Sequence, residues 1–259
     1  MKDFAVELAQ EAGQVLMDYF ERRLVVESKS SEIDLVTEAD VASEKLIVKA
    51  IRERYPEHSV LSEEGLGEKQ AGEFLWLIDP LDGTTNYAHG YPVFCVSIAL
   101  QREGETVLGV TYDPVRDELF CAEKGQGAYC NGRRLSVSGA VNLRRSLLAT
   151  GFPYARASIE DNNVAEFGRI MPRVQGVRRG GAATLDMAYV AAGRLDGYWE
   201  FHLSPWDWAA GDLLVQEAGG RTSDVSGQPW RLRSNNMVAT NGLLHEEMLA
   251  VLKGNFPVE

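Results

Sequence analysis

The residues of this chain that are best suited to chemistry are two carboxylates at the end of an apolar run. Residues 74–78 lead directly into the sequence Asp-Pro-Leu-Asp at 79–82, and a Gly-Thr-Thr turn follows at 83–85. Two carboxylates held this close together repel each other unless a cation or a proton compensates their charge. Carboxylate and carbonyl oxygens are hard ligands that suit Mg²⁺. Either Asp-containing dipeptide alone would be an ordinary turn, but the whole run favours a divalent-cation site.

The turn after these carboxylates offers backbone N–H groups to an anion. Gly83 and Thr84 lie where a helix or turn begins, and consecutive amides in such a position bind phosphate. Pro80 restricts Asp79 to an extended conformation, which would hold the Leu81 carbonyl beside the carboxylates as a further ligand. The sequence therefore predicts neighbouring sites for a cation and a phosphate.

Two more acidic segments complete the candidate cluster. Glu63 follows a predicted strand at 59–62, and Asp207 lies in the first turn of a predicted helix at 206–218. Taken singly, paired glutamates before a glycine are usually solvated, and an acid in the first turn of a helix usually interacts with the helix dipole or caps it. The two segments therefore indicate chemistry only in combination with the run at 79–85.

Other common templates for catalysis are absent from the sequence. It contains no Gly-x-Ser-x-Gly, no P-loop, no His-Glu-x-x-His and no Gly-x-Gly-x-x-Gly, which argues against a serine hydrolase, a P-loop enzyme and a zincin. The four histidines are scattered, so no His-rich metal site is expected. Cys95, Cys121 and Cys130 form no Cys-x-x-Cys pair, and we expect buried small hydrophobic side chains rather than a disulfide framework.

Composition limits the class of protein and of partner. The chain has 259 residues, of which 25% are charged and 45% hydrophobic, and this is ordinary globular usage. Its 38 acidic and 26 basic residues give a formal charge of −12, so neither nucleic acid nor a membrane surface is expected as a partner. No apolar run approaches the roughly 20 residues that span a bilayer, and residues 1–4 lack the apolar core of a signal peptide. We therefore expect a cytoplasmic protein.

Hydrophobic spacing predicts the elements that must position these residues. Apolar residues at helical spacing predict a helix over 3–22 and a second one from a capping box near Thr37 to Pro56, with a polar loop at 29–31. Short apolar runs then predict strands of a largely antiparallel sheet at 74–78, 93–100, 107–112 and 118–122.

The remaining sequence continues this sheet and then alternates strands with helices. Asn131-Gly132 predicts a type I′ hairpin between 128–130 and 135–137. Without a linker or repeat, we expect one α/β domain over 1–259, with an α+β half at 1–140 and an α/β half at 141–259. The predicted strands of the second half are 147–150, 195–201 and 237–240, and its predicted helices are 163–171, 182–192, 206–218 and 243–252.

Taken together, these segments closely resemble the inositol monophosphatase family of Mg²⁺-dependent, lithium-inhibited phosphatases. The runs 76–86 and 206–211 fit the signature motifs of the family in order and separation, and the resemblance covers essentially the whole chain. Residues 29–31 and 34–40 are similar to the family's mobile lid and the Asp that follows it. The resemblance implies a layered α-β-α-β-α sandwich of the inositol monophosphatase and fructose-1,6-bisphosphatase type, an α/β (mixed α+β) fold, and commonly a homodimer.

The resemblance also implies a metal-binding set. Two to three Mg²⁺ ions would bind in each active site. Glu63, Asp79 and the Leu81 carbonyl would hold the first ion. Asp79, Asp82 and Asp207 would hold the second, and Glu63 would hold a weaker third.

Catalytic and substrate residues are implied in the same way. The phosphate would be received by Asp82, Gly83 and Thr84. Thr84, paired with Asp40, would position and deprotonate the attacking water together with Glu63. The residues that would contact the sugar ring are Gly181, Ala182, Ala183, Glu200 and Asp207. For Glu200, an outward-facing place in strand alternation is an equally good interpretation.

The expected reaction is Mg²⁺-dependent hydrolysis of inositol 1-phosphate, with attack by metal-activated water. Fructose-1,6-bisphosphatase and histidinol-phosphatase activities of the same family are alternatives, because fold resemblance does not select a substrate. A different alternative is a regulatory protein that uses this fold to contact RNA, polymerase or another protein. The expected partners are a small sugar or inositol phosphate and a second copy of the chain.

Overall fold

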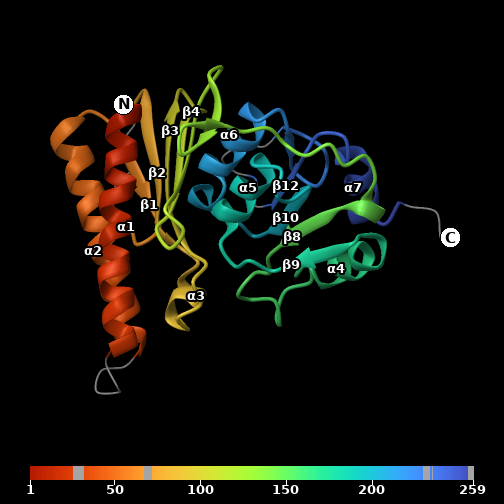
Figure 1. Cartoon of the computed structure of the whole chain (residues 1–259), viewed down its shortest axis with the longest axis horizontal. Helices are drawn as coiled ribbons and strands as arrows, with labels where there is room; N and C mark the ends of the chain where they lie inside the picture. The colour runs from red at the N-terminus through yellow and green to blue at the C-terminus, as the bar shows by residue number, and fades with distance from the viewer. Residues whose placement is uncertain (26–31, 67–71, 230–233, 235, 256–259) are drawn as a thin grey trace.

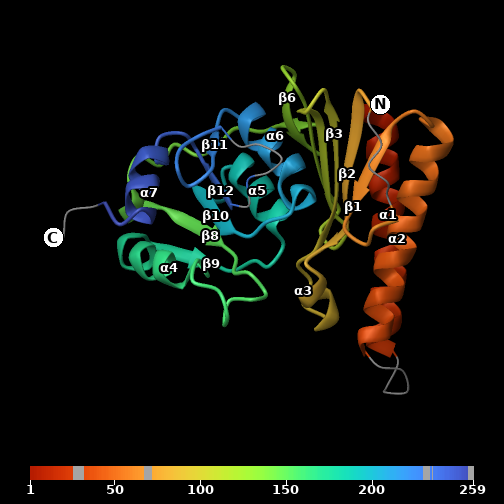
Figure 2. The ribbon, with the colours of Figure 1, turned by 180° about the vertical axis from the view of Figure 1, so that it is seen from behind.

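The computed structural model describes residues 1–25, 32–66, 72–229, 234 and 236–255, with the backbone alone described at 21–25 and 32–37. Its helices and two sheets alternate in five layers, α-β-α-β-α, which Figures 1 and 2 show from opposite sides. One outer layer holds α1 (Lys2–Val25) and α2 (Glu32–Arg54), the middle layer α5 (Ala183–Ala191) and α6 (Ala209–Glu217), and the other outer layer α4 (Val164–Ile170) and α7 (His245–Leu252). The layered sandwich predicted from the sequence is confirmed.

The first sheet has seven strands in chain order. All neighbouring pairs are antiparallel except β1 and β2, which are parallel. Asn131 and Gly132 have φ values of 47° and 76°, so the predicted hairpin is present, although its second strand lies at 133–134 instead of 135–137. The strands are β1 (Ser59–Ser62), β2 (Phe74–Asp82), β3 (Cys95–Arg102), β4 (Glu105–Asp113), β5 (Glu118–Glu123), β6 (Gly127–Cys130) and β7 (Arg133–Arg134).

The second sheet has five strands in the order β11-β12-β10-β8-β9. The central strand β10 is parallel to β8 and antiparallel to β12. The sequence did not predict β9 or β11, because three residues are too few to show a period. The strands are β8 (Leu147–Thr150), β9 (Gly176–Arg178), β10 (Gly197–Phe201), β11 (Arg221–Ser223) and β12 (Asn236–Thr240).

Three hydrophobic cores join the layers. Trp76 and Leu77 are neighbours in β2 but belong to different cores, one against α1 and α2 and one against α5 and α6. Because both faces of β2 are buried, its sequence at 74–78 is an unbroken apolar run instead of an alternating one. The third core contains Trp199, Ile170 and Leu249 between the second sheet and the outer helices. The acidic residues that end β2 therefore extend from a strand that is packed on both sides.

Three of the predicted boundaries that were wrong lie near the candidate site residues. Helix α2 begins at Glu32 and not near Thr37; residues 32–36 contain no Gly or Pro, and acids favour a first helical turn. Strand β2 does not end at residue 78, because its pairing with β3 continues to Asp82. The helix predicted at 206–218 is divided into a 3₁₀ turn (Pro205–Asp207) and α6.

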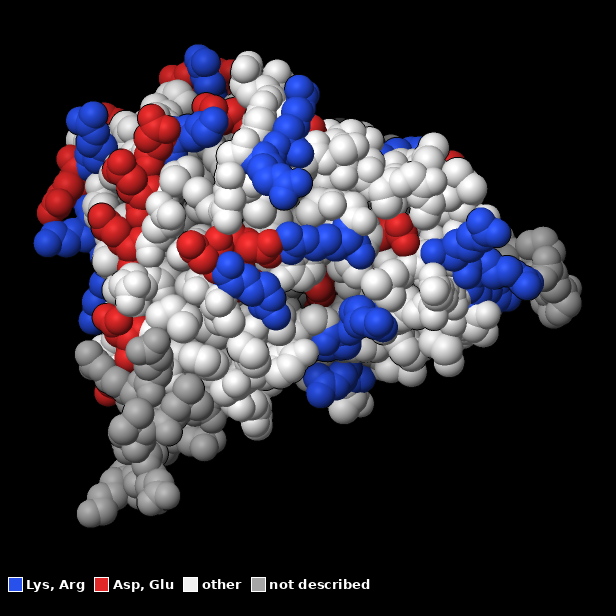
Figure 3. Space-filling view, viewed as in Figure 1, with Lys and Arg blue, Asp and Glu red and all other residues white. Residues whose placement is uncertain are grey.

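Cys95, Cys121 and Cys130 are free and buried, as predicted. Among the described helices, none is long and apolar enough to cross a membrane. On the face drawn in Figure 3, acidic and basic side chains lie next to each other, so the net charge of −12 forms no continuous acidic surface there.

Candidate active site

The first candidate ligands lie in the last part of β2, where its pairing with β3 is irregular. Between Asp79 and Asp82, β2 has one residue more than the facing stretch of β3. Residues three apart in a regular strand face opposite sides of the sheet, and such a bulge removes this restriction. Burial raises the pKa of Asp79 well above its ordinary range, and the charges of Glu63 and Asp82 raise it further. The two aspartates therefore lie within electrostatic reach of each other.

Asp82 is held by residues that lie a hundred positions further along the chain. Its carboxylate accepts the backbone amides of Ala183 at 3.0 Å and Thr184 at 2.7 Å, and the Cys95 thiol lies at 3.5 Å. These amides are at the start of α5, whose N-cap Ala182 provides no side-chain hydrogen bond. Burial raises the Asp82 pKa, and the two amides oppose this rise. Asp82 thus satisfies the open amides of the helix and is oriented by them.

Asp207 approaches the same place from the second half of the chain. It ends the 3₁₀ turn that precedes α6, and its carboxylate accepts the Ser204 amide at 2.7 Å. Its backbone carbonyl accepts the Thr184 hydroxyl at 2.9 Å, which ties this turn to α5. Burial raises the pKa of Asp207, the Ser204 amide lowers it, and the charge of Asp82 raises it. Asp207 therefore belongs to the same electrostatic cluster as Asp82.

Glu63 is the solvent-accessible member of the cluster. Its amide bonds to the Ile78 carbonyl at 3.2 Å, which ties the end of β1 to β2. The atoms packed around its carboxyl raise the Glu63 pKa, a hydrogen bond with Asp79 lowers it, and the charge of Asp82 raises it. Two carboxyls can share a hydrogen bond only when one carries a proton. The repulsion within the cluster therefore favours a bound proton or a bound cation.

The chemistry of these donors fits a hard divalent cation. They are carboxylates and one backbone carbonyl, as Mg²⁺ prefers. The charges of the carboxylates raise one another's pKa, and a cation would relieve this repulsion. Among the described residues, no three acidic, histidine or cysteine side chains are placed so that they could hold a metal ion together, so the fit rests on the types of these donors and not on their placement. That Glu63, Asp79, Leu81, Asp82 and Asp207 are the ligands of such a cation stays a prediction.

The predicted phosphate-binding turn begins a short helix, α3 (Thr84–Ala88). Gly83 precedes it with φ of 101°, and a Cβ there would lie 2.9 Å from the Val93 carbonyl oxygen. Only glycine fits this left-handed, crowded position. The Thr84 hydroxyl donates to the Leu81 carbonyl at 3.1 Å. The turn is therefore fixed beside the acidic end of β2, with its helical amides at the N-terminal end of α3.

Asp40 reaches the cluster from α2. It is 4% exposed, and its Oδ1 atom has no hydrogen-bond partner among the described residues. Burial raises the pKa of Asp40 to about 8, and the charges of Glu64 and Glu63 add to this effect. Within the described residues, the Thr84 hydroxyl bonds to Leu81 and not to Asp40. The catalytic pairing of Thr84 with Asp40 stays a prediction.

Glu200 faces the cluster from β10. Burial raises the pKa of Glu200 to about 7, a hydrogen bond from Tyr198 and the charge of Arg179 lower it, and the charge of Asp82 raises it. A Cβ at Gly151 would overlap the Glu200 carboxylate, so this glycine leaves room for it. Glu200 is therefore half-buried and within electrostatic reach of Asp82, and its contact with a substrate stays a prediction.

Comparison with known proteins agrees with this fold. A model of the inositol monophosphatase family matches residues 1–255. The chain belongs to the inositol monophosphatase family. It is 45% identical to "Nus factor SuhB" of Pseudomonas aeruginosa, over 99% of this chain and 97% of that protein. It is 44% identical to "Inositol-1-monophosphatase" of Synechocystis sp., over 96% and 88%. The solved inositol monophosphatase from Anabaena (Nostoc) sp. PCC 7120 superposes with a TM-score of 0.90 at 46% identity, covering 99% of this chain and 96% of that one.

Membership of the inositol monophosphatase family supports a phosphatase. The substrate residues that the family resemblance implied include the turn before α5, where Gly181 has φ of 89° and Ala182 is the N-cap. The Ala183 amide donates a hydrogen bond to Asp82 at 3.0 Å, so the main chain after this turn contacts the Asp82 carboxylate. Direct contact of these three residues with a sugar ring stays a prediction. The expected lid residues 29–31 lie outside the described residues.

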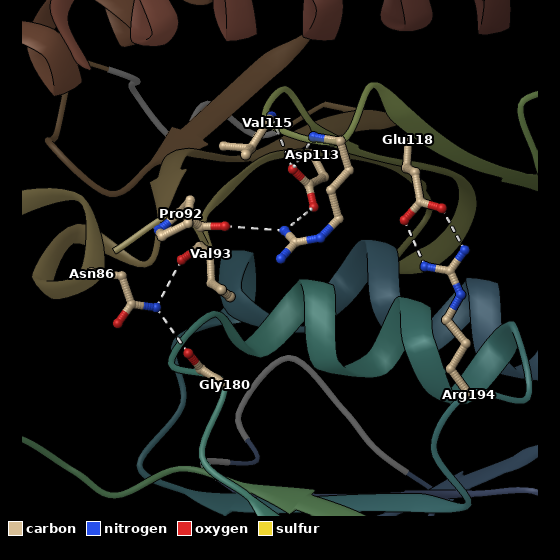
Figure 4. A network of polar contacts seen from close by, with 9 residues as sticks. Asn86, Pro92, Val93, Asp113, Val115, Glu118, Gly180 and Arg194 are labelled. Carbon is tan, nitrogen blue, oxygen red and sulfur yellow. Dashed lines mark hydrogen bonds and ion pairs between the residues drawn. The ribbon is translucent and has the colours of Figure 1, made fainter. Parts of the chain in front are cut away.

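The sequence did not identify two residues that support this inositol monophosphatase-family site. Asn86 bridges two carbonyls, Val93 at 2.7 Å and Gly180 at 2.8 Å (Figure 4). Asp186 is buried in α5 and accepts the Gly180 amide. Asn86 is the last residue of the recognised 76–86 run, and Asp186 had the pattern of an ordinary acid in a first helical turn. Neither the position of Asn86 in that run nor the position of Asp186 in its helix predicts which group its side chain contacts.

Proposed function

We propose that this protein is a Mg²⁺-dependent phosphomonoesterase that hydrolyses inositol 1-phosphate to inositol and phosphate. The observation that carries the proposal is the cluster of Asp79, Asp82 and Asp207, three carboxyls from both halves of the chain whose charges act on one another. The cluster lies beside the amide end of α3, at Gly83 and Thr84. A cation site next to an anion site is what phosphoryl transfer requires, because the reaction depends on positioning and charge neutralisation.

The proposed ligands divide between the ions as the family pattern suggests. Glu63, Asp79 and the Leu81 carbonyl would hold one Mg²⁺, Asp79, Asp82 and Asp207 a second, and Glu63 a weaker third. When bound, Mg²⁺ neutralises phosphate charge and makes a coordinated water more acidic. The raised pKa values of the carboxyls support this assignment, because binding a cation would relieve their repulsion.

The other residues would bind and orient the reactants. The amides of Gly83 and Thr84 would hold phosphate oxygens together with the cluster around Asp82. Glu63 and Asp40 have raised pKa values, and a carboxylate with a raised pKa is a better acceptor for a proton from water. Glu200 would accept hydrogen bonds from ring hydroxyls of the substrate.

The test is a phosphate-release screen with purified full-length protein. Inositol 1-phosphate, fructose 1,6-bisphosphate, histidinol phosphate and an aryl phosphate are compared with Mg²⁺ and with EDTA. The proposal expects Mg²⁺-dependent release with the highest kcat/KM for inositol 1-phosphate. A higher kcat/KM for one of the other natural esters would move the assignment to that activity. Equal values for inositol and aryl phosphate would remove the proposed role of Glu200.

A regulatory function is the second candidate, and the name "Nus factor SuhB" of a relative at 45% identity favours it. Such a protein would use the same fold to contact RNA, polymerase or another protein. Folded protein that releases no phosphate from any ester of the screen would favour this candidate. We also propose that the chain forms a homodimer, and light scattering at micromolar concentration would show a monomer if this is wrong.

A further inference from the structure

The turn that precedes α5 is held through both backbone polar groups of one residue, Gly180. The Gly180 carbonyl accepts the Asn86 side-chain amide at 2.8 Å, and the Gly180 amide donates to the carboxyl of Asp186. A Cβ at Gly180 would overlap that carboxyl. The next residue, Gly181, has φ of 89°, and a Cβ there would lie 2.9 Å from the Asn86 Nδ2 atom. The turn therefore has little freedom while Asn86 and Asp186 are in place.

Asn86 uses both hydrogens of its amide in this arrangement. One contact reaches the Val93 carbonyl at 2.7 Å and the other the Gly180 carbonyl at 2.8 Å (Figure 4). Carbonyl oxygens only accept hydrogen bonds, so the NH₂ group and not the oxygen of Asn86 must face them. Val93 belongs to the segment between α3 and β3, whereas Gly180 lies 94 positions from Asn86. The side chain thus joins the two halves of the chain.

The turn matters because α5 starts directly after it. The helix has no side-chain cap at Ala182, and its first amides, of Ala183 and Thr184, bind the carboxylate of Asp82. A shift of the turn would move these amides and with them the direction of the Asp82 oxygens. Asn86 lies in α3, the helix that begins at the predicted phosphate-binding turn.

We propose that Asn86 is a positioning residue that fixes the turn at 180–182 and, through the first amides of α5, orients the Asp82 carboxylate for its cation. The proposal rests on the proposed function in one respect, since Asp82 is assigned there as a Mg²⁺ ligand. The hydrogen bond from Asn86 to the turn does not depend on metal or substrate, so its effect on the turn is measurable without either.

The test variant is Asn86→Asp, which keeps size and shape but removes both donors and places acceptor oxygens against two carbonyls. Arg194→Gln is the matched control. Arg194 also joins the two halves, through a paired contact with Glu118 (Figure 4), and it lies away from Asp82. Asn86→Ala is measured as well, because it removes the donors without adding repulsion.

Two readouts separate positioning from general stability. Hydrogen exchange of the metal-free full chain, followed by mass spectrometry, should show about tenfold faster exchange in peptides covering 180–187 in both Asn86 variants, because the lost hydrogen bonds held this turn. The Mg²⁺ concentration for half-maximal phosphate release should rise by about tenfold, with KM for the ester less affected. Arg194→Gln should lower Tm while leaving both readouts within about twofold of wild type.

Each outcome decides the proposal. Unchanged exchange at 180–187 in both Asn86 variants would overturn it, and so would an equal change in Arg194→Gln, which would indicate a general loss of stability. Faster exchange with an unchanged Mg²⁺ requirement would overturn the link to Asp82. If wild-type protein releases no phosphate but exchange responds only to the Asn86 variants, the proposed function fails while the hold on the turn is supported.

Discussion

Replacing Asp40 with asparagine should stabilise the metal-free protein at neutral and alkaline pH. Asp40 is 4% exposed, and burial, with the charges of Glu64 and Glu63, raises its pKa from 3.8 to about 8. Between these two values the folded protein keeps a proton on Asp40 that the unfolded chain has lost. The contribution of this group to stability is therefore complete below about pH 4 and is lost as the pH rises to about 8.

The magnitude follows from the width of this window. Each pH unit within it removes about 1.4 kcal/mol from the free energy of unfolding. Between pH 5 and pH 8 the limit is thus about 4 kcal/mol, and relaxation of the buried site reduces it, so we expect about 2 kcal/mol. Asparagine has nearly the same shape and does not titrate, so Asp40→Asn should not show this loss.

The assay is urea unfolding in EDTA, followed by tryptophan fluorescence at pH 5 and pH 8. The stability advantage of Asp40→Asn over wild type should be about 2 kcal/mol larger at pH 8 than at pH 5. Asp18→Asn is the control, because Asp18 is an exposed acid on α1 that accepts a hydrogen bond from Gln14. An Asp40→Asn effect that is the same at both pH values would refute the account of a buried, charge-repelled carboxyl.

Three further substitutions test other parts of the site and its support. Asp82→Asn should lower kcat by at least about 100-fold with little change in Tm; an active variant with the wild-type Mg²⁺ dependence would contradict the placement of the second ion. Glu200→Gln should raise KM for inositol 1-phosphate by about tenfold and KM for an aryl phosphate much less; equal changes would argue against a contact with ring hydroxyls. Asn163→Ala should lower the free energy of unfolding by about 3 kcal/mol in urea titrations, because it leaves the buried Trp199 Nε1, now 2.6 Å from Asn163 Oδ1, without its acceptor. A loss below about 1 kcal/mol would show that another group replaces this acceptor.

The parts of the fold that the sequence predicted well are those with a strong local pattern. Strand β2 is buried on both faces, and its residues 74–78 therefore form an unbroken apolar run. The Asn131-Gly132 dipeptide predicts its turn directly, because the two central residues of a type I′ turn must adopt positive φ and Asn and Gly do so readily. The acidic residues at the end of β2 were predicted for the same reason, since an Asp-Pro-Leu-Asp sequence at a strand end is distinctive. One domain over 1–259 stays a prediction, and a single calorimetric transition would support it.

The parts that the sequence did not predict depend on contacts between distant residues. The bond between Asn86 and Gly180 spans 94 positions, and no spacing rule connects them. Strand β9 has three residues and is defined by its pairing with β8. The electrostatic contact of Glu200 with Asp82 depends on the packing of β10 against the middle layer, which strand alternation alone does not reveal. The assignment of individual Mg²⁺ ligands came from the family resemblance, and it stays a prediction.

The most direct test of the central claim is a Mg²⁺ titration of phosphate release from inositol 1-phosphate, with wild-type protein and Asp79→Asn. The account predicts no release in EDTA, saturable activation of the wild type by Mg²⁺, and loss of that activation in the variant. Release by the wild type that is unchanged in EDTA, or an Asp79→Asn protein with the wild-type Mg²⁺ response, would contradict it.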